Sequence, residues 1–279
     1  MSRRRAFPKL TRSVEIAVLA GIASLLIAVH FLLPDPLRSQ LVFTYGEPSV
    51  VSAWTAAILH DSGSHLASSV GWYAIVMAST YTLATTWQRR RPLWLAIAGC
   101  LVLTPPVTKL VDFWVLSIQW NLVSDATTAR GFSGVVSAFG GVLYVSLART
   151  ATVWHGYDAG VVTIGTIVLG ALSALAITSA VLPPSVAIVL CANVTVAVGS
   201  GIVSNRSHIP EWRAWVVSER DKLLLVGGGS VVVVGLLSQL FQVELDASGR
   251  FVSVIAHGTG FATGMVVTVL AFLLESVSR

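Results

Sequence analysis

The chain alternates between long apolar runs and short polar connections, and the apolar runs have the length of membrane-spanning helices. A helix needs about 20 mainly apolar residues to cross the hydrocarbon core of a bilayer. Eight runs approach or reach this length, at residues 16–33, 66–86, 93–111, 132–147, 160–182, 185–203, 223–241 and 252–274. The pattern therefore predicts an all-α, polytopic membrane helix bundle with about eight transmembrane helices.

The polar connections are too short to form a separate soluble domain. The longest of them are residues 34–61, 112–131 and 204–222. The fifth and sixth runs are divided by Pro183-Pro184, which would interrupt a helix. We therefore interpret residues 1–279 as a single membrane domain that begins with a basic tail at residues 1–13.

The composition agrees with a membrane protein and excludes a nucleic-acid-binding one. Hydrophobic residues make up 54% of the chain and charged residues 11%, and the mean hydropathy is +0.79. A soluble domain carries about 25% charged residues. The net charge is +5, but the basic residues cluster at the ends of apolar runs instead of forming one stripe.

The positions of the basic residues predict how the chain is oriented in the membrane. Cytoplasmic segments of membrane proteins carry an excess of Lys and Arg. With the N-terminus in the cytoplasm, 14 of the 18 Lys and Arg residues lie inside, whereas Arg38, Arg130 and Arg250 lie outside and Lys109 lies within a span. This bias predicts a multi-pass protein of the cell (plasma) membrane with both termini in the cytoplasm.

The N-terminal segment resembles an export signal. Arg3, Arg4 and Arg5 precede the first apolar run, as in a twin-arginine signal. No small-residue cleavage site follows Leu33, so we expect a signal anchor that remains as the first span.

The sequence predicts neither a metal site nor a cofactor. Cys100 and Cys191 both fall within apolar runs and lack metal-ligand spacing, so we expect buried thiols. His60 and His65 are five residues apart and have no third ligand close by in the sequence.

Four polar residues are predicted to share one layer near the outer membrane surface. Ser133 precedes Arg149 by 16 residues, which places it roughly 24 Å above the inner interface at 1.5 Å per residue. The same count places His257 and Ser69 at roughly 27 Å and His65 one turn higher. Ionisable residues inside a membrane are costly and are default candidates for function.

Small residues flank this layer on two of the predicted helices. One stripe consists of Ser133, Ser137 and Gly141, and the other of Ala256, Gly260 and Gly264. Such stripes allow helix backbones to approach closely, and taken alone they indicate packing only. Two close helices could also bring a serine hydroxyl and a histidine nitrogen within the ~3 Å that proton transfer requires.

At these positions the sequence resembles the rhomboid family of intramembrane serine proteases. The nucleophile motif of that family, Gly-x-Ser-Gly, corresponds to Gly131-Phe132-Ser133-Gly134. The histidine motif of its last helix corresponds to Ala256-His257, Gly260 and Gly264, and the histidines of its second span correspond to His60 and His65. The motifs occur in family order and with the expected sidedness.

The sequence departs from the family pattern at several points. Ser69 stands where the family has an asparagine that helps to bind the oxyanion, and Ser137 stands where an aromatic residue is common. Thr55 replaces the arginine of a Trp-Arg loop motif. Three predicted helices, within residues 160–241, separate the serine and histidine spans in place of one.

The resemblance implies a serine endopeptidase that uses a Ser-His dyad and a covalent acyl-enzyme. Ser133 would be the nucleophile and His257 the general base and acid. The backbone N–H of Ser133, His65 and, more weakly, Ser69 would bind the oxyanion. The implied substrates are transmembrane proteins cut near their outer end, in contact with the lipid bilayer. The sequence carries no signal of the substrate's identity or of the oligomeric state.

Two other functions fit parts of the sequence. The substitutions at Ser69 and Ser137 are compatible with a rhomboid-like protein that binds membrane clients and cleaves nothing. Gly227-Gly228-Gly229 and the paired helices at residues 160–203 are compatible with a small transporter. The transporter hypothesis leaves the serine and histidine layer unexplained.

Overall fold

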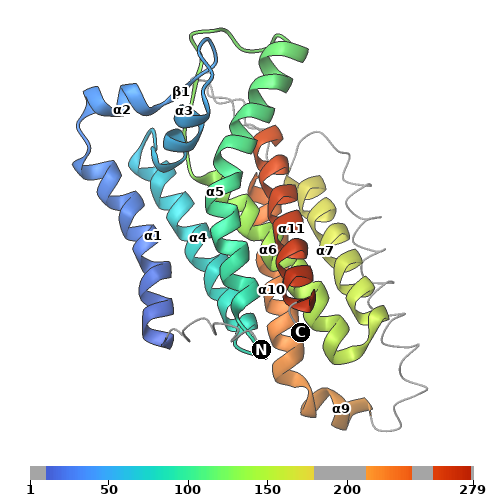
Figure 1. Cartoon of the computed structure of the whole chain (residues 1–279). Coiled ribbons are helices and arrows are strands. Elements are labelled where there is room, and N and C mark those ends of the chain that lie inside the picture. Colours follow the sequence, from blue (N-terminus) through green and yellow to red (C-terminus); the bar gives the residue numbers. More distant parts are fainter. Residues whose placement is uncertain (1–10, 179–211, 241–253, 278–279) are drawn as a thin grey trace.

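The computed structural model describes residues 11–178, 212–240 and 254–277, which form a bundle of long helices (Figure 1). The long helices are α1 (Arg12–Leu32), α4 (Gly63–Ala84), α5 (Arg91–Phe113), α6 (Ser133–His155), α7 (Tyr157–Thr178), α10 (Arg220–Leu240) and α11 (Val254–Val277). Short helical segments are α2 (Asp35–Leu41), α3 (Val50–Thr55), the 3-10 turn η1 (Ala56–Ile58) and α9 (Trp212–Ser218).

Six of these helices are long and apolar enough to cross a membrane, which makes the protein an all-α, multi-pass membrane bundle. They are α1, α5, α6, α7, α10 and α11. The predicted second span forms α4, whose Ser, Thr, Tyr and Trp residues make it less apolar than these six. The predicted sixth span, residues 185–203, lies outside the described residues, as does Cys191.

Several helices extend beyond their predicted ends. The chain after α5 continues as the π-helix η2 (Trp114–Gln119), so part of the predicted connection at residues 112–131 is helical. Helix α6 runs on to His155 and ends at Gly156, whose φ of 91° suits only glycine well. Hydropathy marks where a helix leaves the apolar layer, and a helix continues past that point until a residue such as Gly156 ends it.

Helix α6 lies at the centre of the bundle. In its apolar window 83% of the residues are buried, and it packs against α4, α5, α7, α10 and α11. Its glycines permit this crowding, because Gly140 lies under the Leu236 side chain and Gly141 lies against the Phe261 carbonyl. By contrast, α1 lies at one side of the bundle and packs mainly on α4 (Figure 1).

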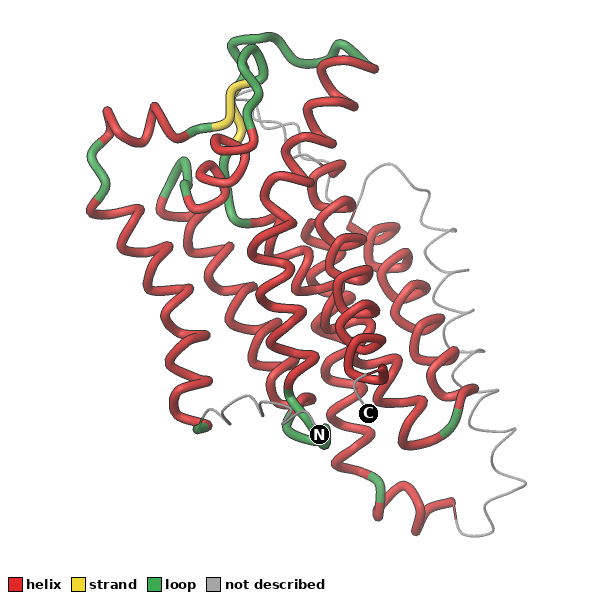
Figure 2. Tube along the Cα trace, viewed as in Figure 1, coloured by secondary structure: helices red, strands yellow, loops and turns green. Residues whose placement is uncertain are grey.

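A small folded segment covers the end of the bundle at which α4, α6 and α11 begin. Figure 2 shows its two strands, β1 (Phe43–Thr44) and β2 (Thr128–Ala129), which pair antiparallel with Phe43 opposite Ala129. Phe43 belongs to a separate apolar cluster, which also contains Tyr45, Ala53, Ala56 and Leu116. The ribbon ties the chain after α1 to the chain that enters α6, and we call this end of the bundle the ribbon end.

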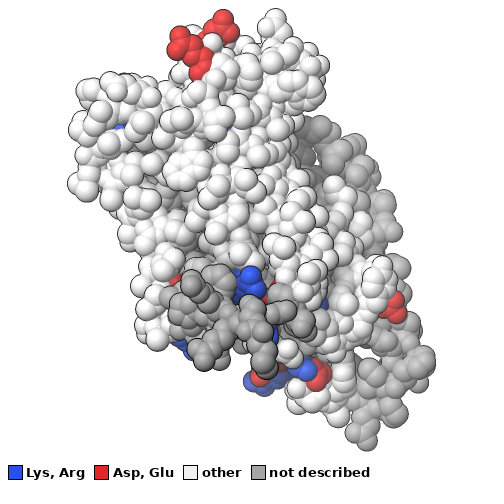
Figure 3. Space-filling view, viewed as in Figure 1, with Lys and Arg blue, Asp and Glu red and all other residues white. Residues whose placement is uncertain are grey.

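Basic side chains gather at the opposite end of the bundle, which we call the basic end (Figure 3). This end holds Arg89, just before α5, together with Arg91 at the start of α5 and Arg149 in the last part of α6. Because α4, α6 and α11 all run from the ribbon end to the basic end, residues early in these three helices lie in one layer.

Candidate active site

Ser133 and His257 lie side by side at the ribbon end of the bundle. Ser133 is the first residue of α6, and His257 lies in the first turn of α11. The distance between Ser133 Oγ and His257 Nε2 is 3.0 Å, within hydrogen-bonding range. Ser133 and His257, which the helical rise per residue placed in one layer, are therefore in contact.

A backbone carbonyl fixes the orientation and tautomer of the His257 ring. His257 Nδ1 lies 2.7 Å from the carbonyl oxygen of Leu240, the last residue of α10. A carbonyl oxygen can only accept a hydrogen bond, so Nδ1 carries the ring proton and donates the hydrogen bond to the Leu240 carbonyl. In the neutral ring this leaves Nε2 with its lone pair directed at Ser133, which can donate its hydroxyl proton to that nitrogen.

Close packing of α6 and α11 holds the pair in register. A Cβ atom on Gly260 would overlap the Gly134 carbonyl, and one on Gly264 would overlap the Ala138 carbonyl. The Ser137 hydroxyl donates a 2.6 Å hydrogen bond to the His257 carbonyl, and Ser137 is fully buried. Ser137 therefore anchors the backbone of the histidine, whereas an aromatic residue would need space that the close approach removes.

His65 lies next to the segment that enters α6. Gly131 has a φ of 126°, and a Cβ atom placed on it would lie 2.8 Å from His65 Cε1 and 3.9 Å from Ser133 Oγ. The Gly131 N–H donates to the Ala56 carbonyl at 3.0 Å. Glycine is thus required at 131 both by its backbone conformation and by the imidazole that lies against it.

The two other predicted residues near His65 are Ser69, in α4, and His60, in the loop before α4. Ser69, one turn further along the helix, is buried. The His60 and His65 rings form an edge-to-face pair with centroids 5.2 Å apart. Burial, together with the neighbouring rings of His65 and His30, lowers the pKa of His60 to about 3, so His60 is neutral at physiological pH.

An ion pair that the sequence did not indicate joins this layer from the loops. Arg130 pairs through Nε with Asp61 Oδ1, and Asp61 Oδ2 lies 3.9 Å from His65 Nδ1. Asp61 precedes the start of α4, and Arg130 follows β2. The pair therefore links the loop before His65 to the loop before Ser133.

A second polar group lies at the end of α5, where the sequence offers Asp112 as a possible partner of Lys109 but does not indicate its contact with Tyr45. Asp112 is 1% exposed, and its carboxylate accepts a 2.6 Å hydrogen bond from the Tyr45 hydroxyl. Lys109, one turn earlier, is also buried, so it does not extend to the membrane surface. Burial and the charge of Asp112 raise the pKa of Tyr45, which keeps its hydroxyl protonated as a donor.

Comparisons with protein families, with curated proteins and with solved structures find no match to this chain. Within the described ranges, no three His, Cys, Asp or Glu side chains are grouped so that they could hold a metal ion.

Proposed function

We propose that this chain is an intramembrane serine endopeptidase of the rhomboid type, with Ser133 as the nucleophile and His257 as the general base. The observation that carries the proposal is the line of hydrogen bonds from Ser133 Oγ through the His257 ring to the Leu240 carbonyl. A nucleophile, a base and a group that orients the base are the three parts that activation of a serine requires.

The reaction follows from this geometry in two stages. Ser133 Oγ attacks the scissile carbonyl carbon while its proton passes to His257 Nε2. The peptide C–N bond then breaks, the leaving amine takes that proton, and an acyl ester remains on Ser133. Water attacks the ester and gives a proton to Nε2, which returns it to Ser133 Oγ as the C–O bond breaks. The Leu240 carbonyl stabilises the transient imidazolium without taking its proton.

The start of α6 supplies a binding site for the oxyanion. The first N–H groups of a helix have no acceptor within the helix, and the helix dipole adds partial positive charge there. The amide of Ser133 is one of these groups, and the His65 imidazole and the Ser133 hydroxyl both face the position that a Cβ atom on Gly131 would take. One such donor contributes about 3 kcal/mol to the transition state. Ser69 is a weaker donor than an amide side chain, so we expect slower catalysis here than with asparagine.

The proposed substrates are transmembrane proteins cut close to the outer membrane surface. The Ser133 and His257 pair lies in the first turns of its helices, at the ribbon end. With both termini in the cytoplasm of a plasma-membrane protein, this end faces outward, where water can enter and a substrate helix can unwind. The basic end would then face the cytoplasm, as the positive-inside rule requires.

A fluorophosphonate probe, which phosphonylates only an activated serine, tests the proposal. The full chain in membranes should be labelled, and Ser133→Ala should not be. His257→Ala should be labelled at a rate at least about 10²-fold lower than the wild type. Ser146→Ala is the matched control, because Ser146 is buried on α6 roughly 20 Å further along and its hydroxyl has no partner among the described residues. Equal labelling of wild type and Ser133→Ala would eliminate Ser133 as the nucleophile.

A rhomboid-like protein that binds membrane clients without cleaving them is the second candidate. Ser69 favours it, because the short hydroxyl side chain is a poorer oxyanion donor than the amide it replaces. This candidate predicts no probe labelling in the wild type, together with retained capture of a transmembrane peptide by both the wild type and Ser133→Ala.

A further inference from the structure

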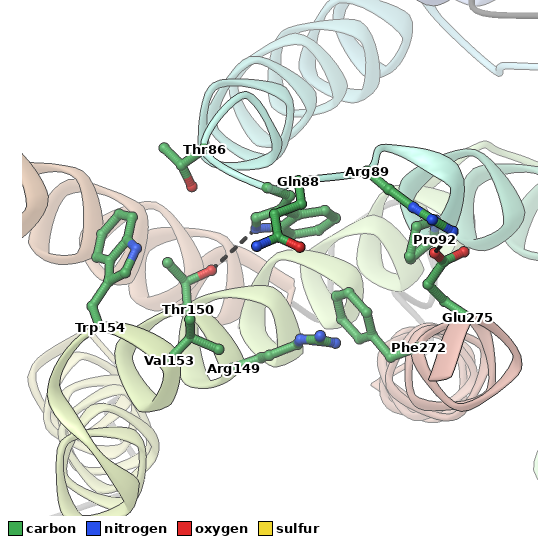
Figure 4. Close-up of a pocket in the computed structure, with 11 residues that line it drawn as sticks. Thr86, Gln88, Arg89, Pro92, Arg149, Thr150, Val153, Trp154, Phe272 and Glu275 are labelled. Carbon is green, nitrogen blue, oxygen red and sulfur yellow. Dashed lines mark hydrogen bonds and ion pairs between the residues drawn. The ribbon is translucent and has the colours of Figure 1, made fainter. Parts of the chain in front are cut away.

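A second candidate site lies at the basic end, opposite Ser133 and His257. It is a cavity of about 300 Å³ between the end of α4, the start of α5 and the last turns of α6 and α11 (Figure 4). Ligand-binding pockets begin at about this volume. None of the residues around this cavity takes part in the proposed peptidase reaction, so its role is a separate question.

The cavity and its rim carry more positive than negative charge. Glu275 is only 5% exposed in its side chain, and its carboxylate lies 3.1 Å from Arg89 Nη1 and 4.0 Å from Arg91 Nη1. Arg149 lies over the neighbouring Phe272 ring, at 4.0 Å from the ring centroid (Figure 4). Two guanidinium groups thus lie beside the Glu275 carboxylate and a third lies on Phe272, so the described residues leave a net positive charge at the site.

The start of α5 adds to this positive potential. Pro92, in the first turn of α5, lines the cavity, and the residue before the helix provides no side-chain cap. A helix of 23 residues carries partial positive charge at its N-terminus, where anions such as phosphate bind. The cavity therefore combines guanidinium groups that can bind a phosphate with a helix N-terminus directed at the same place.

The walls of the cavity suit the interfacial layer of a membrane. Trp87 and Trp154 line it together with Phe272, and Trp87 Nε1 donates a 3.2 Å hydrogen bond to Thr150 Oγ1. Tryptophan side chains concentrate at the depth of the lipid headgroups. Basic pockets between transmembrane helices at this level are suited to anionic headgroups.

We infer that this cavity binds a phosphate anion, supplied by the headgroup of an anionic phospholipid. The phosphate would contact the guanidinium group of Arg149, which packs on Phe272, and that of Arg89, which also pairs with Glu275. The N-terminus of α5 would add its partial positive charge. The aromatic walls contact the glycerol and upper acyl region. A free phosphate in the cytoplasm has the same chemistry, and the experiment separates the two sources.

The test measures lipid binding to the purified full chain by native mass spectrometry. Phosphatidylglycerol should bind at least tenfold more tightly than phosphatidylcholine. Arg149→Gln should weaken phosphatidylglycerol binding about tenfold, the loss of one charge-assisted contact. Arg149→Lys, which keeps the charge but loses the planar group, should weaken it less. Unfolding midpoints measured without lipid establish that each variant is folded.

Arg220→Gln is the matched control, because Arg220 begins α10, is 72% exposed in its side chain and lies outside the cavity. It should change binding less than twofold. If Arg149→Gln and Arg220→Gln weaken binding equally, the attraction is one of general surface charge and the proposed site is wrong. Equal binding of the two lipids, with no binding of inorganic phosphate, would also overturn it. If inorganic phosphate alone binds and depends on Arg149, the phosphate site stands and its ligand comes from solution.

Discussion

The buried carboxylate of Asp112 shows how much a single residue at the ribbon end depends on its partner. Asp112 is almost completely enclosed, and the Tyr45 hydroxyl reaches it from the segment that follows β1. A buried carboxylate that loses a donor retains its desolvation cost without the compensating bond. Tyr45 therefore connects the ribbon to α5 through a hydrogen bond as well as through apolar packing.

Replacing Tyr45 by phenylalanine tests this contribution. Tyr45→Phe should lower the free energy of unfolding by about 1–3 kcal/mol, because Asp112 loses a hydrogen bond while the ring volume is kept. Tyr157→Phe is the control, since Tyr157 is 76% exposed at the start of α7, and it should change stability by less than 0.5 kcal/mol. Thermal unfolding of the two variants in the same detergent provides the comparison. A Tyr45→Phe midpoint equal to that of Tyr157→Phe would show that the bond adds nothing.

Some of these residues could be placed from the sequence and others could not. Ser133 and His257 could be paired because the rise of a helix is fixed, so counting from basic and acidic interface residues gives a depth. The contact of His257 with the Leu240 carbonyl could not be predicted, because every residue has a carbonyl group. Which carbonyl reaches His257 depends on where α10 ends beside α11. Tyr45 and Asp112 are 67 residues apart, so their contact depends on the tertiary path of the connecting segment.

At the scale of elements, the α6 and α11 interface determines whether the pair can form. The two helices touch through backbone, with Gly260 against the Gly134 carbonyl and Gly264 against the Ala138 carbonyl. Such contacts leave no space for a single added carbon. A separation of the helices by one methyl group would lengthen the distance between Ser133 Oγ and His257 Nε2 beyond hydrogen-bonding range.

Gly264→Ala tests the interface without touching the pair itself. The added Cβ would overlap the Ala138 carbonyl, so we expect a loss of about 1–3 kcal/mol in stability and a strong loss of fluorophosphonate labelling. The control is Gly227→Ala on α10, where a Cβ atom meets no other atom within 4 Å. Gly227→Ala should keep the stability and the fluorophosphonate labelling of the wild type. Normal labelling in a folded Gly264→Ala protein would show that the pair tolerates a wider separation.

Elements were predictable to different degrees. The long helices of the bundle follow from apolar runs, because a lipid environment requires every span to satisfy its own backbone hydrogen bonds. The β1 and β2 ribbon could not be predicted, since two-residue strands carry no periodic pattern. The π-helix η2 could not be predicted either, because its apolar residues fit an α-helix equally well; its Leu116 is buried in the cluster with Phe43 and Tyr45.

The two ends of the molecule differ in the sites they carry. Ser133, His257 and His65 lie at the ribbon end, and the cavity proposed to bind phosphate lies at the basic end, with α4, α6 and α11 running from one to the other. In a membrane the two ends face different compartments. The proposed peptidase requires the ribbon end outside, and the proposed lipid site requires the basic end at the cytoplasmic leaflet.

Cysteine accessibility in intact cells decides between this orientation and its reverse. In a background with Cys100 and Cys191 replaced by alanine, Ser124→Cys lies exposed between η2 and β2, and Ser276→Cys lies exposed at the end of α11. A membrane-impermeant maleimide should label Ser124→Cys in intact cells and should label Ser276→Cys only after the cells are opened. The reverse pattern would place Ser133 at the cytoplasmic leaflet, where cleavage near the outer end of a substrate is impossible. If the chain has the eight predicted spans, 14 of its 18 basic residues favour the first arrangement. Each of these charges would add to the free-energy cost of inversion, so we expect a single orientation.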